Sequence, residues 1–160
     1  MLIPCFDIKL ESRNTMLDTK EEIQQLIGEA FEAQKMSYAP YSNFHVGAAL
    51  LTKSGKVYRG CNIENAAYSP GNCAERTAIF KAVSEGETNF SAIVIVGNKA
   101  GVEKGAGELC APCGVCRQVL AEFCDPVEFR IILAWGEDTY KECTLGELLP
   151  YGFIKENLDH

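Results

Sequence analysis

The stretch CAERTAIFKAVSEGETNFSAIVIVG, residues 73–97, decides the fold class. Residues 74–85 favour a helix, which is predicted to stop at Gly86 because glycine commonly follows the last helical turn. Residues 91–96 (SAIVIV) are rich in β-branched side chains and bounded by Gly97, which is typical of a strand buried on both faces. A helix followed by such a strand predicts an α/β domain built in layers.

The segments on either side continue this alternation of helices and strands. A capping box formed by Thr19 and Glu22 predicts a helix that runs to about Ser37. A hairpin follows it, and beyond residue 97 a long glycine-containing loop leads to further elements. The expected elements are strands at 45–52 and 57–63, a loop at 98–112, a helix at about 113–124, a strand at 129–135 and a short helix opened by Thr144 and Glu147. This order predicts a mixed sheet with packed helices.

Composition predicts one globular domain. The chain has 160 residues, of which 47% are hydrophobic and 23% are charged. We assign residues 19–160 to the domain and residues 1–18 to an N-terminal arm. The formal net charge of -7 offers no basic surface for nucleic acid. Without an apolar run of about 18 to 20 residues or a signal peptide, we expect a cytoplasmic protein that binds a small molecule and no membrane.

Two of the predicted helices begin with cysteine. Cys73 is followed by Ala74 and Glu75, and Cys113 and Cys116 form a C-x-x-C after Pro112. Unpaired N–H groups at helix N-termini favour thiolates, and a catalytic zinc ion keeps one of its four positions for water. Three thiolates with one nearby carboxylate therefore predict a catalytic zinc site, in which Glu75 moves protons without binding the metal.

Other interpretations of these cysteines stay open. Cys113 and Cys116 suit a thiol redox pair, or a structural zinc site with Cys61 or Cys110 as fourth ligand. We expect Cys110 to be a spectator, because it precedes the proline and does not share the helix N-terminus. Arg76 and Arg117 directly follow key residues and are candidates to offset the negative charge of the thiolates.

The C-x-E and P-C-x-x-C motifs together resemble the signature of zinc nucleoside and nucleobase deaminases. Further blocks are similar to the small homotetrameric cytidine deaminases and cover about residues 20 to 153. These blocks are YAPYSNF at 38–44, VGAA at 46–49, GCNIENA at 60–66, CAERTA at 73–78, PCGVCRQ at 112–118 and ELLP at 147–150. The resemblance implies a three-layer cytidine-deaminase-like α/β domain, with a mixed five-stranded sheet and helices on both faces.

The resemblance also implies roles for individual residues. Cys73, Cys113 and Cys116 would bind one Zn²⁺ per subunit, and Glu75 would be the catalytic proton carrier. The remaining implied roles are base stacking for Phe44, contacts to the ribose hydroxyls for Asn62 and Glu64, substrate binding for Ala74, compensation of thiolate charge for Arg76, completion of a neighbouring subunit's site for Phe153, and a subunit boundary for Tyr68.

The implied activity is hydrolytic deamination of cytidine and 2′-deoxycytidine to uridine and 2′-deoxyuridine with release of ammonia, as in pyrimidine salvage. One alternative is a related enzyme that acts on a cytosine-bearing antibiotic such as blasticidin, or on polynucleotides, which the acidic charge disfavours. Another is a non-catalytic zinc protein, which leaves the C-x-E and N-I-E-N blocks unexplained. The loop from Asn98 to Ala111 and the N-terminal arm are longer than is usual for the family.

Overall fold

A five-stranded sheet forms the centre of the computed structural model, which describes residues 17 and 19–158. Its strand order is β2-β1-β3-β4-β5. The strands are β1 (Phe44–Thr52), β2 (Val57–Cys61), β3 (Phe90–Lys99), β4 (Arg130–Ala134) and β5 (Tyr140–Thr144). Strands β3 and β4 are parallel, and the other neighbouring pairs are antiparallel. The predicted mixed five-stranded sheet is therefore confirmed.

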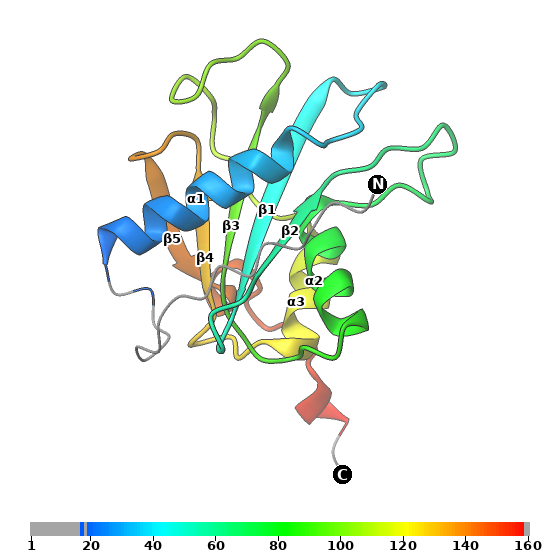
Figure 1. The fold of residues 1–160 in the computed structure, drawn as a ribbon. Helices are drawn as coiled ribbons and strands as arrows, with labels where there is room; N and C mark the ends of the chain where they lie inside the picture. Colours follow the sequence, from blue (N-terminus) through cyan, green and yellow to red (C-terminus); the bar gives the residue numbers. More distant parts are fainter. Residues whose placement is uncertain (1–16, 18, 159–160) are drawn as a thin grey trace.

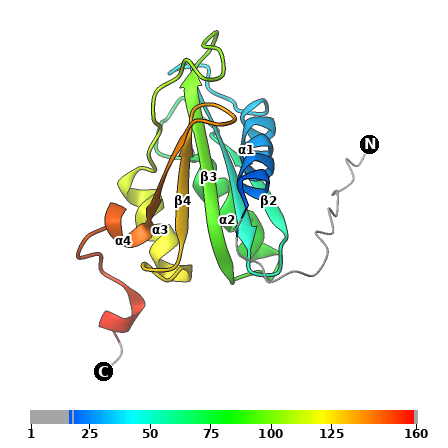
Figure 2. The same cartoon turned by 90° about the vertical axis from the view of Figure 1, so that its left-hand side faces the viewer.

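Helices cover both faces of this sheet, which confirms the three layers expected from the sequence. Helix α1 (Lys20–Gln34) lies across one face, and α2 (Ala74–Ser84) and α3 (Gly114–Phe123) lie on the other (Figures 1 and 2). A short helix α4 (Leu145–Leu148) and a 3₁₀ turn (Lys155–Asn157) follow β5. No helix in the described part of the chain is long and apolar enough to cross a bilayer.

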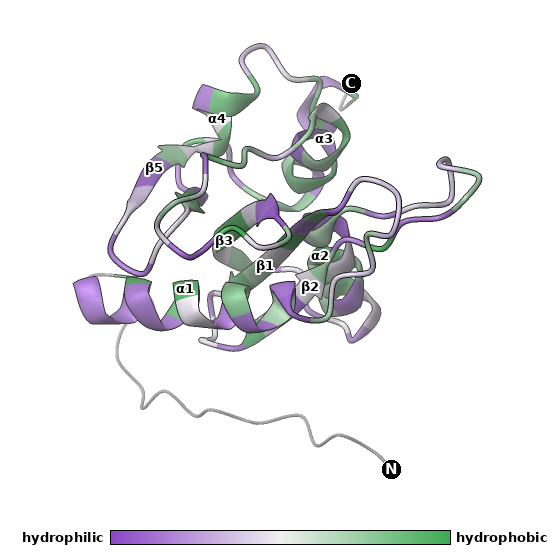
Figure 3. Cartoon of the chain, turned by 90° about the horizontal axis from the view of Figure 1, so that it is seen from above, coloured by the Kyte–Doolittle hydropathy of each residue, from purple (hydrophilic) through white to green (hydrophobic). Residues whose placement is uncertain are grey.

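The central strand β3 packs against an apolar cluster on each of its two faces. Ile93 and Ile95 pack into the cluster formed with α2 and α3, whereas Val94 and Val96 pack into the cluster under α1. Figure 3 shows hydrophobic residues concentrated on β1 and β3, and alternating hydrophilic and hydrophobic bands along α1. The uninterrupted apolar run in β3 is thus the direct result of helices on both sides of it.

Several boundaries differ from those predicted. Helix α1 ends at Gln34 rather than near Ser37, so Met36 lies beyond the helix and is 72% exposed. Strand β3 extends to Lys99, because its last residues still pair with the start of β1. The sequence of strand β5 has no clear alternation of apolar and polar residues that would predict a strand. The reason is that β5 lies at the edge of the sheet, where its side chains are at most partly buried.

The arm predicted over residues 1–18 lies outside the described residues, apart from Leu17. Leu17 is buried in the cluster under α1, and its carbonyl accepts a hydrogen bond of 2.6 Å from Arg130 Nη1. This residue therefore packs with the domain that we predicted to begin at residue 19.

Strand directions bring the starts of two helices to one edge of the sheet. Strands β2 and β3 both pair antiparallel with β1, so their carboxyl ends point the same way. Helix α2 follows β2 in the chain and α3 follows β3, so both helices begin on that side. Strand β1 begins there too, since Phe44 pairs with Lys99 at the end of β3. The topology thus gathers the predicted site residues, although they are far apart in sequence.

Candidate functional site

Three cysteines meet where α2 and α3 begin. Cys73 is the N-cap residue of α2, and Cys113 is the N-cap residue of α3. Cys73 Sγ lies 3.8 Å from Cys113 Sγ, and Cys113 Sγ lies 3.5 Å from Cys116 Sγ. All three sulfur atoms lie within 4.8 Å of one another. The structure therefore brings together the predicted metal ligands.

The geometry and chemistry of this cluster fit zinc. A Zn–S distance of about 2.3 Å in a tetrahedral site places two sulfur atoms about 3.8 Å apart, close to the observed separations. Within residues 17 and 19–158, no fourth histidine, cysteine or carboxylate joins the three sulfur atoms. A tetrahedral ion held by three protein ligands retains a position for water or substrate, which is the arrangement of catalytic rather than structural zinc.

Arg76 supplies positive charge beside the sulfur atoms. Its Nη2 donates to Cys73 Sγ at 3.5 Å, and hydrogen bonding to this thiolate raises the pKa of Arg76. The Nε atom of Arg76 is buried without a hydrogen-bond partner in the described structure. Arg117, the other candidate cation, instead donates to the carbonyl oxygens of Pro112 and Leu148. Arg76 is thus the cation that contacts a ligand sulfur.

Hydrogen bonding within the cluster also affects the thiols. The bond between the sulfurs of Cys73 and Cys116 lowers the pKa of Cys73, and Arg76 adds to this effect. The same bond raises the pKa of Cys116, because the two sulfur atoms share a proton. The guanidinium group of Arg76 thus favours the thiolate form of Cys73, which is the form that binds zinc.

Glu75 occupies the first turn of α2 and is only 4% exposed. Burial raises the pKa of Glu75 to about 7, and the negative charge of Cys73 contributes further. A carboxyl group with a pKa near neutrality accepts and releases a proton readily, which suits general acid and base catalysis. The predicted proton carrier thus has the environment that its role requires.

A cleft of about 370 Å³ opens over Glu75 and the cysteine cluster. Cavities of about 300 to 1,000 Å³ are typical of small-molecule sites. Of the predicted site residues, the cleft is lined by Asn62, Glu64, Cys73, Ala74, Glu75, Arg76 and Cys113. Cys116 lies beneath it and is fully buried. Most of the predicted site is thus one continuous surface.

Two predicted substrate contacts do not line this cleft. Phe44 is half-buried at the start of β1, and its ring packs closely against Gly97 of β3. Phe153 follows α4 and is 60% exposed, with its carbonyl oxygen held by Gln118 Nε2 at 2.7 Å. In a single chain, Phe153 therefore lies outside the cleft formed by the other site residues.

The side chains of Asn62 and Glu64 are held by backbone groups near the start of β1. Asn62 Nδ2 donates to the Phe44 carbonyl oxygen, and Asn62 Oδ1 accepts from the Val46 amide, each at 2.8 Å. Glu64 Oε2 accepts from the Tyr41 amide at 2.8 Å. A hydrogen bond from the Ser42 side chain lowers the pKa of Glu64 most, followed by the Tyr41 amide. Glu64 is thus stabilised as a carboxylate at the cleft.

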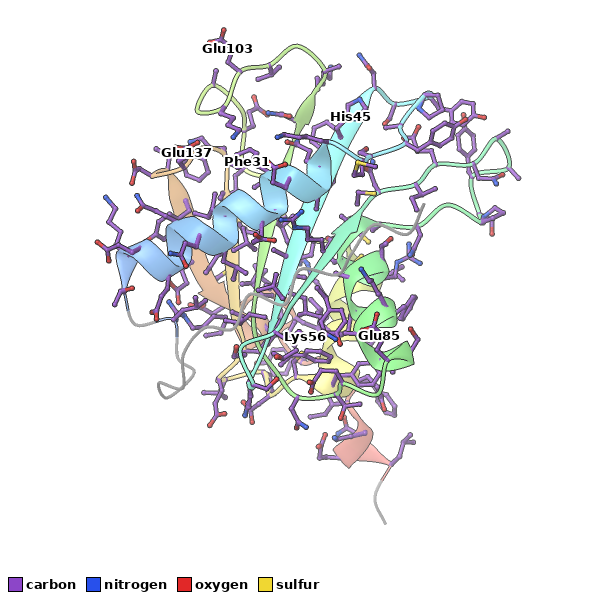
Figure 4. All side chains as sticks on the ribbon, viewed as in Figure 1. Phe31, His45, Lys56, Glu85, Glu103 and Glu137 are labelled. Atoms are coloured by element: carbon purple, nitrogen blue, oxygen red, sulfur yellow. The ribbon has the colours of Figure 1, made fainter. Side chains whose placement is uncertain are left out.

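The structure places three further residues at or beside this site. Cys110, which we predicted to be a spectator, is not part of the three-sulfur cluster, but it lines the cleft. Burial raises the pKa of its thiol to about 11. Ser37 and His45 contact Asn62 or each other, and Figure 4 shows His45 at the start of β1 near the end of α1. Only tertiary contacts reveal their positions, since neither residue has a recognisable motif spacing.

Comparisons with known proteins agree with this geometry. Residues 20–130 match the family described as "Cytidine and deoxycytidylate deaminase zinc-binding region". The chain is 46% identical over 139 residues to a cytidine deaminase of Sporosarcina psychrophila, covering 87% of this chain and 96% of the relative. It is 47% identical over 136 residues to one from Halalkalibacterium halodurans, covering 85% and 97%.

A solved structure extends the match to the fold. The crystal structure of cytidine deaminase from Burkholderia pseudomallei superimposes with a TM-score of 0.71 at 45% identity. The match covers 81% of this chain and 97% of that chain. Sequence, fold and the three-cysteine cluster agree, and the chain belongs to the cytidine and deoxycytidylate deaminase zinc-binding family.

Proposed function

We propose that this chain hydrolyses the amino group of cytidine and 2′-deoxycytidine, giving uridine or 2′-deoxyuridine and ammonia. The observation that carries the proposal is the placement of a buried carboxyl group, Glu75, in a cleft beside three metal-binding sulfur atoms. The two similar bacterial proteins named cytidine deaminase support the choice of substrate. Such a reaction belongs to pyrimidine salvage, and a cytoplasmic location stays a prediction.

In the proposed mechanism, Glu75 moves the protons. Zinc held by the three cysteines would supply Lewis-acid activation of the attacking water. Glu75 removes a proton from this water, whose oxygen bonds to the amine-bearing carbon of the base. Glu75 then protonates the ring nitrogen. It next moves the proton of the newly added hydroxyl to the amino group, so that the carbon–nitrogen bond breaks, ammonia leaves and the carbonyl group of uridine forms. One water is consumed for each cytidine, and the pKa of Glu75 near 7 allows it to act in both directions.

Residues around the cleft would orient the nucleoside. Asn62 and Glu64 provide a side-chain amide and a carboxylate for the sugar hydroxyls, and Ala74 lies beside Glu75 in the wall. Phe44 would stack on the base, which requires its half-buried ring to turn towards the cleft or the substrate to extend to it. Contacts to the sugar would fix the position of the reacting carbon, which is far from those hydroxyls.

We also propose that the protein acts as a homotetramer in which Phe153 completes the site of a neighbouring subunit. The exposed position of Phe153 outside its own chain's cleft supports this arrangement. Tyr68, which lines the cleft and is also exposed, would lie at the same boundary. Covering an exposed aromatic ring with a partner removes apolar surface from water, which favours association of the subunits.

The experiment that tests the function measures conversion of cytidine to uridine and zinc content on the same purified sample. We expect about one zinc per chain and robust turnover. Glu75→Gln should retain zinc, because Glu75 is not among the three ligands, and should lower kcat by at least about 100-fold. Unchanged turnover in the Glu75→Gln variant would contradict the assignment of Glu75.

Parallel assays with blasticidin and single-stranded DNA separate this proposal from its alternatives. Activity on either one without activity on cytidine would show a different substrate on the same site. Zinc binding without turnover of any of these substrates would favour a structural metal site. The net charge of -7 disfavours the polynucleotide, since a phosphate backbone requires basic side chains.

A further inference from the structure

We propose that Ser37 and His45 are positioning residues that orient the Asn62 amide, so that it presents one N–H group to a sugar hydroxyl of the substrate. The inference rests on the proposed function and concerns residues outside the cleft lining. Ser37 lies between α1 and β1, and His45 lies at the start of β1, whereas Asn62 follows β2. Three separate parts of the chain therefore determine how this amide is presented.

The hydrogen bonds of Asn62 determine which group faces the cleft. Its Oδ1 accepts from the Val46 amide at 2.8 Å and from Ser37 Oγ at 2.5 Å. Its Nδ2 donates one hydrogen to the Phe44 carbonyl oxygen at 2.8 Å. The backbone amide of Val46 can only donate, so the oxygen of Asn62 must lie on that side. Among the described contacts, one N–H of Nδ2 stays available to a ligand in the cleft.

The direction of the bonds through Ser37 also follows from chemistry. A serine hydroxyl carries one hydrogen, and Asn62 Oδ1 has none to offer. Ser37 therefore donates to Asn62, and its oxygen accepts from His45 Nδ1, 3.1 Å away. His45 is thus held with a hydrogen on Nδ1, and the chain of bonds runs from His45 through Ser37 to Asn62.

The backbone on both sides of this chain of bonds is fixed. Gln34, the last residue of α1, donates from Nε2 to the His45 carbonyl oxygen at 2.8 Å and to Asn98 Oδ1 at 2.9 Å. The Tyr38 amide donates to the Asn62 carbonyl oxygen at 3.0 Å. Gln34 therefore holds the backbone of His45, and its own carbonyl oxygen accepts from the Ser37 amide at 3.0 Å. Figure 4 shows His45 near the end of α1.

Glu64 complements the amide at the same surface. Its carboxylate accepts from backbone amides and offers only further acceptor sites, whereas Asn62 offers only a donor. A hydroxyl group both donates and accepts, so one sugar hydroxyl can bind Glu64 and Asn62 at once. A rotated Asn62 amide would present its oxygen beside the Glu64 carboxylate and lose this match. Ser37 thus sets the recognition of the sugar without contacting it.

The test compares cytidine with 2′,3′-dideoxycytidine, which lacks the 2′- and 3′-hydroxyls of the sugar, by measuring kcat and KM. We expect Ser37→Ala to lower kcat/KM for cytidine about 3- to 10-fold, chiefly through KM, as loss of a neutral hydrogen bond predicts. For the dideoxy substrate, the same variant should differ from the parent by less than about twofold. Ser37→Thr keeps the hydroxyl and should restore the cytidine value, and His45→Ala should act in the same direction as Ser37→Ala.

Ser91→Ala is the matched control. Ser91 is also half-buried, and its hydroxyl donates to the Leu51 carbonyl oxygen at 3.3 Å, at the opposite end of β3. This variant should leave both substrates unaffected. Equal losses on the two substrates in Ser37→Ala would indicate a general structural role and overturn the inference, as would no loss on cytidine. Parent protein that is inactive on cytidine would instead refute the proposed function, and this inference with it.

Discussion

We propose that Arg76 balances part of the charge of the metal site. Three thiolates around one zinc ion leave the cluster with a net negative charge, which weakens the activation of water. The guanidinium group of Arg76 donates to Cys73 Sγ at 3.5 Å, and its positive charge would offset part of this negative charge. Side chains that contact metal ligands in this way commonly change activity about 10- to 100-fold when they are replaced.

We expect Arg76→Gln to retain about one zinc per chain and to lower kcat about 10-fold, because the ligands persist while their charge is less compensated. Steady-state kinetics and metal analysis of the same sample provide the measurement. Arg59→Gln is the control, since Arg59 pairs with Glu29 on the surface at the other side of the sheet. Unchanged kcat in Arg76→Gln would argue against charge compensation.

Cys124 lies at the C-terminal end of α3, at the opposite end of this helix from Cys113 and Cys116. Cys124 is 6% exposed, and burial raises the pKa of its thiol to about 12. Since thiolates react with iodoacetamide and thiols do not, we expect labelling of Cys124 at about pH 8 to be at least about 100-fold slower in the folded than in the urea-unfolded protein. Peptide mass spectrometry measures both rates. Comparable rates in the two states would mean that the C-terminal end of α3 opens frequently.

At the scale of elements, the contact between α1 and β1 depends on the absence of a side chain at Gly47. A Cβ atom at this position would lie 2.1 Å from the Ala30 carbonyl oxygen and 2.5 Å from the Gln34 amide nitrogen. Both are backbone atoms of α1, so a larger residue must push the helix away from the sheet. The same contact holds Gln34 beside His45, which is linked through Ser37 to Asn62 in the wall of the cleft.

Two glycine substitutions should have opposite effects on stability. Gly47→Ala should lower the free energy of unfolding by about 2 to 3 kcal/mol, because overpacking separates α1 from β1. Gly28→Ala, inside α1 with no atom within 4 Å of the new Cβ, should raise it by about 0.5 to 1 kcal/mol. Urea unfolding measures both changes. A stabilising alanine at position 47 would show that the helix can shift freely.

At the scale of the whole molecule, Phe153 lies apart from the cleft within a single chain. Phe153 is exposed in the single chain, and the cleft is lined without it. The hydrogen bond from Gln118 to its carbonyl oxygen fixes the backbone of this segment to α3. A side chain held outward in this manner is available to a neighbouring molecule.

The proposed tetramer predicts a mass in solution of about 70 kDa, four times the 17.6 kDa of one chain. Phe153→Ala should lower kcat/KM on cytidine about 10-fold, as loss of an aromatic contact predicts. When this variant is coexpressed with Glu75→Gln, mixed tetramers should regain activity, because intact Glu75 sites receive Phe153 from the other chain. Light scattering and assays of purified mixed tetramers measure these outcomes.

Coexpression of Phe153→Ala with the double variant Glu75→Gln, Phe153→Ala is the control for this rescue. No chain in that mixture carries an aromatic residue at position 153, so activity per intact Glu75 site should not rise above that of the single Phe153→Ala variant. An active species of 17.6 kDa, or an absence of rescue in the first mixture, would contradict a contribution between subunits.

The features that depend on local patterns could be predicted from the sequence alone. The alternation of helices and strands, the buried run in β3 and the capping box of α1 predicted the α/β class, because each follows from nearby residues. The spacing of Cys73 with Glu75 and of Cys113 with Cys116 predicted the cluster, because each pair lies at a helix N-terminus. Local rules thus identified the candidate ligands, and the topology of the sheet brings them together.

The features that depend on contacts between distant residues could be seen only in the folded chain. Strand β5 has little apolar pattern of its own and forms by pairing with β4 at the edge of the sheet. Ser37 contacts Asn62, and His45 contacts Ser37, only because folding brings the start of β1 beside the end of β2. Cys110 lines the cleft only because the loop after β3 returns to it. Side-chain hydrogen bonds act over about 3 Å, so their partners are set by packing across the sheet and not by spacing along the chain.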